Sequence, residues 1–349
     1  MAFTVERDLP PIQEVLQTYP AMPEVVEQQR ESIRRILEGK DQRLLVGAGP
    51  CSFFPIEAGV QNAKRIADFN KRFGDVFYFI ERVYSIKPRT NNGWEGIQFN
   101  PYPNKPHNGG VNIVEGIYAT RSAFHQVAPH IGVMDEILNP DLKDYFNDLL
   151  CCGAIGARNA CAMWHRRAAG GMEFPMGMKH DMSGDLKSAV DGVIVAQTPG
   201  NHLILQMKQQ SVSGNPHAFA ILRGSEANGP NWEPHAIGNI TDMLCDAQVK
   251  NPAVIVDCSH ANCIDRKSGE KTVEEQMRVL RAVVKNRFDY PEAYRHFRGI
   301  MTEVFTLPGK QKAGPDMNME GLSITDPCIG IDNAESLFEE LADYVRQRG

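Results

Sequence analysis

The sequence lacks the marks of a membrane-spanning, secreted or nucleic-acid-binding protein. Its longest apolar runs, such as residues 253–256, fall far short of the ~20 residues that cross a bilayer. The chain does not open with a basic segment followed by an apolar one, so its start does not resemble a secretory signal. Positive charge is not in excess, because 37 Lys and Arg stand against 43 Asp and Glu. We therefore expect a cytoplasmic protein without a nucleic-acid or membrane partner.

Several familiar site motifs are also absent or incomplete. The eight cysteines lie mostly in apolar segments of a large chain, which indicates buried thiols rather than disulfides. Cys258, His260 and Cys263 have no second close Cys or His pair, which argues against a zinc finger. Residues 47–52 (GAGPCS) lack the third glycine of a dinucleotide loop and the Gly-Lys-Ser/Thr ending of a P-loop. We interpret them as a strand-end turn that directs Cys51 into a site.

Short apolar runs alternate with longer helical patterns from residue 44 onward, which is typical of βα units. The predicted strands cover residues 44–47, 76–83, 131–137, 154–157, 174–179, 218–222, 254–257 and 299–304. The predicted helices cover residues 55–73, 111–127, 141–150, 159–169, 185–197, 233–249, 272–284 and 334–347. Eight alternations favour an α/β fold of the (β/α)8 TIM barrel type over a doubly wound sheet.

Two additions to the barrel are predicted. Residues 1–40 should form an N-terminal arm with a helix, because apolar residues recur there at helical spacing before Gly39. Residues 41–349 then form a single catalytic barrel domain. A short extra β-hairpin is expected before the sixth barrel strand, from residues 202–207 and a turn at 211–216.

Polar side chains stand at or just after the C-terminal ends of all eight predicted strands. They are Cys51, Arg82, Glu136, Arg158, Lys179, Arg223, His260 and Glu303. Each is weak evidence alone, since a single Arg after a strand is usually a solvated loop residue. Barrel enzymes place their chemistry at this end, so eight such residues together predict an active site.

These residues and their neighbours fall into two chemical groups. Six cations are expected around the barrel mouth, namely Arg82, Lys87, Arg89, Arg158, Lys179 and Arg223, and they predict a strongly anionic substrate. The second group is a thiol, an imidazole and two carboxylates from distant segments: Cys51, His260, Glu303 and Asp326. That mixture suits a borderline divalent metal such as Mn, Fe, Co or Zn. Asp326 alone could equally be a helix cap before Pro327.

Several motifs together resemble type I 3-deoxy-D-arabino-heptulosonate 7-phosphate (DAHP) synthases over nearly the whole chain. They are GPCS at 49–52, RVY at 82–84, KPRT at 87–90, GAIGAR at 153–158, ILRG at 221–224, DCSHAN at 257–262 and SITD at 323–326. The KPRT segment is the most specific, because it resembles the one that separates this family from 3-deoxy-octulosonate 8-phosphate synthases. The resemblance implies a (β/α)8 enzyme that condenses phosphoenolpyruvate with erythrose 4-phosphate at the head of the shikimate pathway.

The resemblance also implies roles for individual residues. It implies metal ligation by Cys51, His260, Glu303 and Asp326, with manganese as the expected metal. It implies that phosphoenolpyruvate is held by Arg82, Glu136, Arg158, Lys179 and Arg223, and the aldose phosphate by Lys87, Arg89 and Thr90. Lys87, His260 and Cys51 are the expected catalytic residues. The arm and the resemblance together predict a homodimer or homotetramer that acts on small phosphorylated substrates.

Three segments depart from the family pattern. The chain has NACAMWHRR at 159–167, HDMSG at 180–184 and EVF at 303–305, where the family usually carries other runs. One hypothesis is therefore a DAHP synthase, and a second is a paralogue that condenses phosphoenolpyruvate with a different aldehyde or sugar phosphate. A third hypothesis, a non-catalytic binding paralogue, is disfavoured because every proposed ligand and cation is retained.

Overall fold

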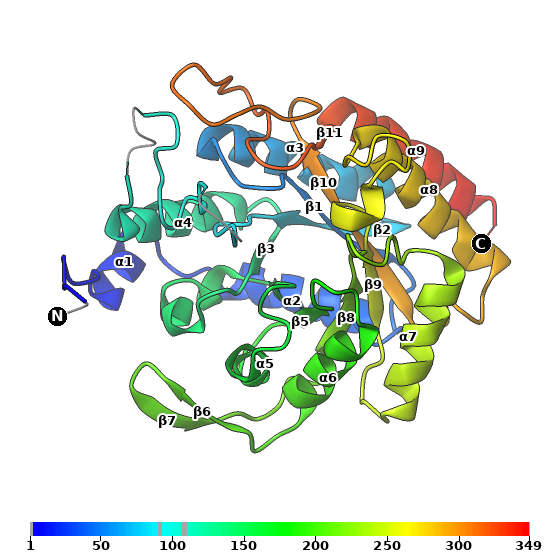
Figure 1. The fold of residues 1–349 in the computed structure, drawn as a ribbon, viewed down its shortest axis with the longest axis horizontal. Helices are drawn as coiled ribbons and strands as arrows, with labels where there is room; N and C mark the ends of the chain where they lie inside the picture. The colour runs from blue at the N-terminus through cyan, green and yellow to red at the C-terminus, as the bar shows by residue number, and fades with distance from the viewer. Residues whose placement is uncertain (1–2, 90–92, 106–109, 349) are drawn as a thin grey trace.

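The computed structural model describes residues 3–89, 93–105 and 110–348. Within these ranges, eight parallel strands follow one another in sequence order around a closed barrel, with helices on the outside (Figure 1). The ring closes because the first strand pairs with both the second and the last, with Leu45 opposite Tyr78 on one side and Gly299 on the other. The predicted (β/α)8 fold is confirmed.

All eight predicted barrel strands are present, with ends that differ from the prediction by a few residues. They are β1 (Leu44–Gly49), β2 (Phe77–Arg82), β3 (Gly132–Glu136), β4 (Cys152–Ile155), β5 (Met176–Lys179), β8 (Phe219–Leu222), β9 (Val254–Asp257) and β10 (Phe297–Phe305). A two-residue strand, β11 (Ile329–Gly330), extends the sheet beside the end of β10.

The outer layer consists largely of the predicted helices. They are α3 (Ile56–Phe73), α4 (Ile113–Val127), α5 (Met163–Ala169), α6 (Leu186–Gln197), α7 (Pro234–Asp246), α8 (Val273–Asp289) and α9 (Ile331–Arg346). The helix predicted at 141–150 is wrong, because this segment forms two short 3₁₀ turns, η2 (Pro140–Tyr145) and η3 (Asn147–Leu149). Arg121 and Arg30 explain the difference, because their guanidinium groups donate hydrogen bonds to the carbonyls of Tyr145 and Asn147, each at 2.6 Å. These carbonyls thus accept from distant side chains instead of from the backbone of a regular helix.

The predicted hairpin exists, but its predicted turn is wrong. Strand β6 (His202–Leu205) pairs with β7 (Lys208–Ser211), so the chain reverses at Gln206 and Met207 rather than at residues 211–216. Both turn residues have positive φ, 52° and 58°, as the tightest hairpins require. Asp141 holds this turn by accepting the Gln206 N–H at 2.8 Å, a contact from outside the hairpin that local sequence does not reveal.

The N-terminal arm contains two helices, α1 (Ile12–Thr18) and α2 (Pro23–Leu37), where the sequence predicted one. Ile33, Ile36 and Leu37 of α2 are buried in one cluster with inward-facing strand residues such as Leu45 and Met301. Because Leu45 lies near the start of β1, α2 closes the N-terminal end of the barrel.

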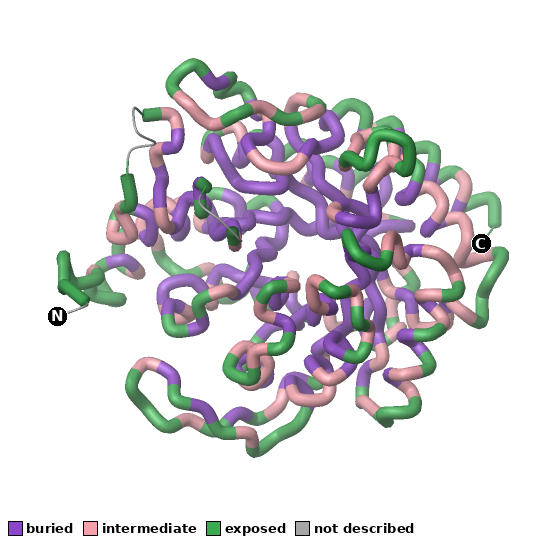
Figure 2. Tube along the Cα trace, in the orientation of Figure 1, coloured by how far each residue is buried: buried purple, intermediate pink, exposed green. Residues whose placement is uncertain are grey.

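Burial follows this layered arrangement. Figure 2 shows the barrel strands almost entirely buried, while exposed residues lie in the N-terminal segment, the hairpin, the loops and the outer faces of the helices. None of the described helices combines the length and the apolar content of a membrane span. The opposite end of the barrel from α2 is left open for a site, where the strands carry their C-terminal residues.

Candidate active site

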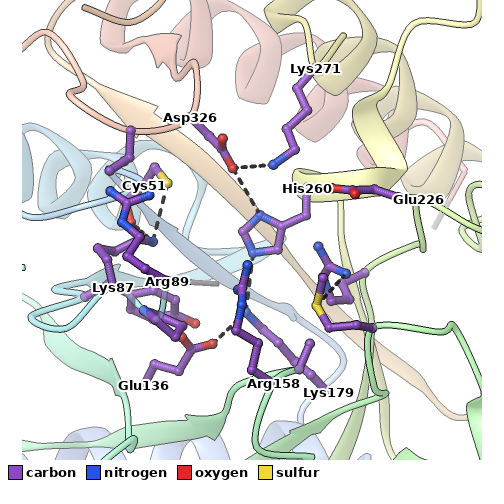
Figure 3. A pocket seen from close by; sticks show the side chains of 16 residues that line it. Cys51, Lys87, Arg89, Glu136, Arg158, Lys179, Glu226, His260, Lys271 and Asp326 are labelled. Carbon is purple, nitrogen blue, oxygen red and sulfur yellow. Dashed lines mark hydrogen bonds and ion pairs between the residues drawn. The ribbon is translucent and has the colours of Figure 1, made fainter. Parts of the chain in front are cut away.

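A polar cavity of about 160 Å³ opens at the C-terminal ends of the barrel strands (Figure 3). Among the described residues, six cations line it: Lys87, Arg89, Arg158, Lys179, Arg223 and Lys271. Three carboxylates also line it, from Glu136, Glu226 and Asp326. This excess of positive charge inside an acidic protein favours a ligand that carries several negative charges.

The barrel brings most of the sequence-predicted site residues to this cavity. Nine of them line it, namely Cys51, Lys87, Arg89, Glu136, Arg158, Lys179, Arg223, His260 and Asp326. Glu303 is buried beside them on β10 and contacts His260. Thr90 lies outside the described residues.

Arg82 does not lie at the mouth, where the sequence placed it as one of six cations. Its side chain is fully buried, and its guanidinium lies 3.1 Å from Glu303 and 4.0 Å from Asp257. The direction of the side chain explains the difference, because Arg82 is the last residue of β2 and points into the barrel interior rather than out of the mouth. Lys271, from the loop before α8, occupies the sixth cationic place at the cavity.

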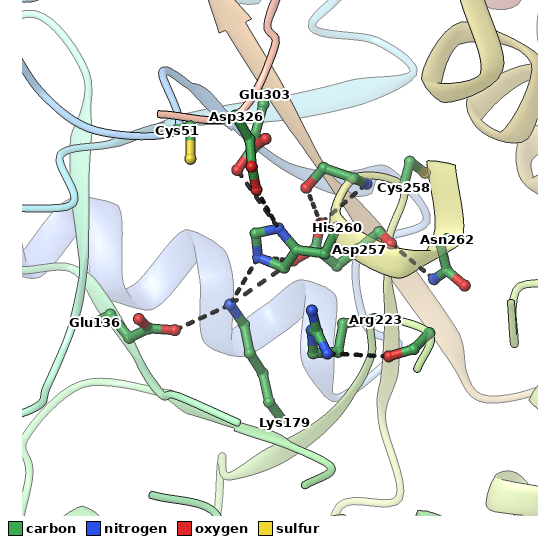
Figure 4. A network of polar contacts seen from close by, with 12 residues as sticks. Cys51, Glu136, Lys179, Arg223, Asp257, Cys258, His260, Asn262, Glu303 and Asp326 are labelled. Carbon is green, nitrogen blue, oxygen red and sulfur yellow. Dashed lines mark hydrogen bonds and ion pairs between the residues drawn. The ribbon is translucent and has the colours of Figure 1, made fainter. Parts of the chain in front are cut away.

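Sulfur and carboxylate donors meet at one side of the cavity (Figure 4). Ligand atoms of Cys51, Glu303 and Asp326 all lie within 4.8 Å of one another. His260 joins them, with Nδ1 3.6 Å from Glu303 Oε1 and 3.9 Å from Asp326 Oδ2. A thiol, an imidazole and two carboxylates form a donor set for a borderline divalent metal, so these residues fit such an ion.

The protonation of the cluster agrees with a cation site. Burial and the nearby Glu303 carboxylate raise the pKa of Cys51 to about 11. Burial, followed by the cations Lys179 and Arg223, lowers the pKa of His260 well below its usual value, so the imidazole is neutral and can act as a ligand. A bound divalent cation would favour the thiolate form of Cys51, since metal coordination deprotonates a thiol.

Backbone geometry fixes the positions of the donors. Gly49 ends β1 with φ +146°, and a Cβ there would lie 2.8 Å from the Arg82 backbone nitrogen. Only glycine lets the chain turn this close to β2, and the turn delivers Cys51 to the cavity. On β10, Gln276 accepts the Glu303 N–H at 2.6 Å and so ties the strand to α8.

Lys87 lies directly against the thiol cluster. Its Nζ donates to the Cys51 carbonyl at 2.6 Å and lies 3.4 Å from Sγ. Although burial favours the neutral amine, Cys51, Glu303 and Glu136 raise the pKa of Lys87, so the side chain carries its proton. The site therefore places a charged donor beside the donor cluster.

A second network surrounds Lys179 at the base of the cavity. Its Nζ lies 2.9 Å from Glu136 and 3.8 Å from Asp257 Oδ2. Asp257 is fully buried, and its Oδ2 has no hydrogen-bond partner among the described residues, although His260 Nε2 is 3.4 Å away. Asp257 was not among the site residues predicted from the sequence, although its place at the end of a predicted strand could have indicated it.

Arg223 is held in place by a residue in one of the departing segments. His180 is fully buried, and its Nε2 accepts the Arg223 backbone N–H at 3.2 Å and the Asn231 amide at 2.9 Å. Its Nδ1 lies 2.9 Å from the Asp181 carbonyl, which requires a proton on Nδ1. Burial lowers the pKa of His180 to about 4, so this neutral tautomer persists at physiological pH.

Lys271 also lines the cavity without having been predicted from the sequence, as does Glu226. Its Nζ pairs with Asp326 Oδ2 at 2.6 Å, and although burial opposes the charge, this ion pair raises its pKa. Lys271 comes from a loop beyond the strand ends, paired only through an isolated bridge to Ile264. No strand-end rule could have found it, because the loop reaches the mouth only in the folded chain.

Comparison with known proteins gives consistent matches. Residues 21–339 match the model of the DAHP synthetase I family. A phospho-2-dehydro-3-deoxyheptonate aldolase of Corynebacterium glutamicum is 34% identical over 336 residues, covering 93% of this chain and 87% of the relative. The Trp-sensitive enzyme of the same name from Escherichia coli K12 is 32% identical, covering 95% of this chain and 93% of the relative.

A solved structure agrees with the sequence matches. The phospho-2-dehydro-3-deoxyheptonate aldolase from Francisella tularensis superposes with a TM-score of 0.89 at 28% identity, and the match covers 99% of both chains. The likeness thus extends over the arm, the barrel and the hairpin alike.

Proposed function

This chain belongs to the DAHP synthetase I family, and from that premise we propose how its barrel mouth carries out the family reaction. The protein is an enzyme that condenses phosphoenolpyruvate with erythrose 4-phosphate to give DAHP and phosphate, the first step of aromatic amino acid biosynthesis. One observation carries the assignment of this reaction to the mouth. Six cations that suit two phosphorylated substrates surround a cavity that adjoins a metal-type donor cluster.

The cations divide between the two substrates. We assign phosphoenolpyruvate to Arg158, Lys179 and Arg223, whose charges would neutralise its phosphate and carboxylate, with Arg82 and Glu136 holding the surrounding network. Glu136 keeps the Lys179 ammonium in position through their 2.9 Å contact. The aldose phosphate is assigned to Lys87, Arg89 and Thr90, on the segment that follows β2.

The residues of the chain then support each bond change. The enol carbon of phosphoenolpyruvate attacks the aldehyde carbon, and the charged Lys87 donates a hydrogen bond to the aldehyde oxygen as negative charge develops there. Water adds at C2, and phosphate leaves when the C2–O bond breaks, so the three charges of Arg158, Lys179 and Arg223 stabilise the departing dianion. Binding of both substrates in one mouth supplies the proximity that the bimolecular step needs.

A divalent metal belongs to this reaction, and the residues that would hold it are Cys51, His260, Glu303 and Asp326. When bound, such a metal supplies a Lewis acid for the aldehyde oxygen and orients that substrate. We propose manganese, because the two carboxylates suit a hard ion while the thiol and the imidazole accept a borderline one. The catalytic roles of Lys87, His260 and Cys51 rest on this arrangement.

The departing segments do not favour a different acceptor. None of residues 159–167 lines the cavity, and within residues 180–184 only Met182 lines it, while His180 lies behind Arg223. Phe305 is fully buried and packs with Cys51 and Cys328, so it supports the thiol from outside the mouth. The departures therefore change the cavity lining only at Met182, which lies beside Arg223 on the side assigned to phosphoenolpyruvate. Lys87 and Arg89, on the aldose side, are unaffected, which supports erythrose 4-phosphate as the acceptor.

We further propose that the enzyme is a homodimer or homotetramer of 41–349 barrels, each with its own arm. The support is the arm itself, where Phe3 and Val5 expose 92% and 85% of their surface, apolar area that contact with a partner subunit would bury. Sedimentation of the purified protein tests this proposal, and a monomer at micromolar concentration would contradict it.

The reaction is tested with purified protein, Mn2+, phosphoenolpyruvate and erythrose 4-phosphate. We expect stoichiometric release of phosphate and formation of DAHP, both stopped by EDTA and restored by added metal. Arg223→Ala should lower kcat/KM at least ~100-fold, because a charge-assisted contact to a dianion is lost, whereas Arg281→Ala on the outer face of α8 should not. Absence of turnover with every divalent metal, or faster turnover with another aldose, would contradict the assignment.

A further inference from the structure

A second cavity lies at the other end of the barrel from the active site. It measures about 300 Å³ and lies between the loop that enters β1 and the segment that joins α8 to β10. Leu44 and Phe297, the first residues of these two strands, both line it. Cys51 follows the other end of β1, and Glu303 lies near the other end of β10, so the two cavities are at opposite ends of these strands and share no lining residue.

Four arginines line this cavity, and two of them already have carboxylate partners. Arg43 pairs with Asp41 at 2.6 Å, and Arg295 pairs with Asp242 at 2.6 Å. The Asp41 hydrogen bond raises the pKa of Arg43, and the Asp242 hydrogen bond does the same for Arg295. These two ion pairs are complete without a ligand.

The other two arginines, Arg287 and Arg298, have no carboxylate within ion-pair distance among the described residues. Arg287 stacks on the Phe288 ring, 4.7 Å from its centroid. Arg298 donates from Nη1 to the carbonyls of Arg295 and Phe297, while its buried Nε has no hydrogen-bond partner in the described part of the chain. Burial lowers the pKa of both groups, the opposite of the shift in the paired arginines.

Two half-buried guanidinium groups that share a cavity and lack a carboxylate leave an uncompensated charge of about +2 there. Partial burial of such charges is costly unless an anion completes them. A phosphate group provides two negative charges on one compact centre, and guanidinium groups bind it through paired N–H donors. The remaining volume can hold an organic moiety beside Phe297 and Pro291.

We propose that this cavity is a binding site for a small phosphate-bearing dianion, held by Arg287 and Arg298. The site is separate from the catalytic mouth and does not depend on the proposed reaction. The same chemistry fits inorganic phosphate and a small phosphate ester, so the test includes both.

The direct test is residue-resolved protection of arginines. The full-length protein is treated with phenylglyoxal in chloride, in inorganic phosphate or in glycerol 3-phosphate at equal ionic strength, and modified peptides are quantified by mass spectrometry. At a phosphate concentration about ten times Kd, modification of Arg287 and Arg298 should slow about tenfold. Arg281, on α8 and paired with Glu340, is the internal control and should react equally in all buffers.

The arms separate the possible ligands. Stronger protection by glycerol 3-phosphate than by inorganic phosphate identifies a phosphate ester as the ligand. Equal protection by the two identifies the phosphate group alone. Either result supports the site. Equal protection by succinate would overturn the phosphate class. Equal modification rates in chloride and phosphate, or protection that does not saturate by ~10 mM, would overturn the site.

A matched pair of variants provides a second, independent readout. Phosphate should raise the melting temperature of the wild-type protein by binding both at the mouth and at the proposed site. Arg287→Gln should lose most of the part that comes from the proposed site. Arg281→Gln should keep the whole rise, since both variants have the same mouth. Melting in chloride shows that each variant folds, and identical phosphate-dependent shifts in the two variants would contradict the proposal.

Discussion

Asp135 should make the stability of this barrel fall as the pH rises through neutrality. The residue is 5% exposed on β3, and burial raises its pKa from 3.8 to about 7. The folded state holds this proton more tightly than the unfolded state does. The contribution of Asp135 to the free energy of unfolding is therefore largest below pH 4. The free energy of unfolding then decreases as pH rises from the unfolded pKa to the folded pKa, and the loss is complete above about pH 7.

The magnitude follows from the two pKa values. A difference of about three units corresponds to about 4 kcal/mol at high pH, and about 2–3 kcal/mol of it is lost between pH 5 and pH 8. Asp135→Asn should remove this slope and still fit the site. Its Oδ1 keeps the Ser85 and Glu136 N–H groups, and its Nδ2 can donate to Ser85 Oγ, which then donates to Gln98.

Urea unfolding of the wild-type and variant proteins from pH 5 to pH 8 measures the effect. We expect the stability difference, variant minus wild type, to grow by about 2–3 kcal/mol over this range. Asp316→Asn, at an exposed position, is the control and should show no such trend. A constant difference between the wild-type protein and Asp135→Asn would refute the reasoning.

Three other substitutions test separate features. Cys51→Ala should lower the amount of bound metal, measured by elemental analysis, at least ~10-fold, whereas Cys161→Ala should not. Equal metal content in the two variants would show that the Cys51 thiol is not a ligand. His180→Phe should raise KM for phosphoenolpyruvate about 10-fold or more, because the Arg223 N–H and the Asn231 amide lose their acceptor. His180→Gln should recover part of this loss, and an equal rise in KM for the aldose would point to general damage. Gly49→Ala should destabilise the fold by more than about 2 kcal/mol in thermal unfolding. Gly200→Ala, where φ is also positive (+80°) but a Cβ would meet no neighbour, should destabilise it by about 1 kcal/mol, and equal losses would mean that the close approach to Arg82 is unimportant.

The strands of the barrel could be predicted because they are buried on both faces, so their sequences are short apolar runs between polar turns. The polar residues after those runs also reach the mouth, since the C-terminal ends of parallel strands meet at one edge. The direction of a side chain at the strand end was not predictable, because one residue decides whether it points inward. Arg82 points into the barrel interior for this reason.

The features that escaped prediction depend on contacts between distant segments. Residues 141–150 have a helical pattern, but arginines from α2 and α4 bind their carbonyls. The turn at Gln206 and Met207 contains no glycine and is held by Asp141. Lys271 reaches the mouth on a loop that has no regular position relative to the strands. In each case the deciding partner lies far away in the chain.

The closure of the barrel between β1 and β10 has a consequence for how the enzyme is assembled. Leu45 pairs with Gly299, so the last gap in the ring closes only after almost the whole chain has been synthesised. Cys51 follows β1 on one side of this seam, while Glu303 lies on β10 and Asp326 beyond it on the other. A cation held by these three residues would join the two edges, so its binding energy would also oppose reopening of the ring. The residues that we propose as metal ligands would thus also hold the two edges of the barrel together.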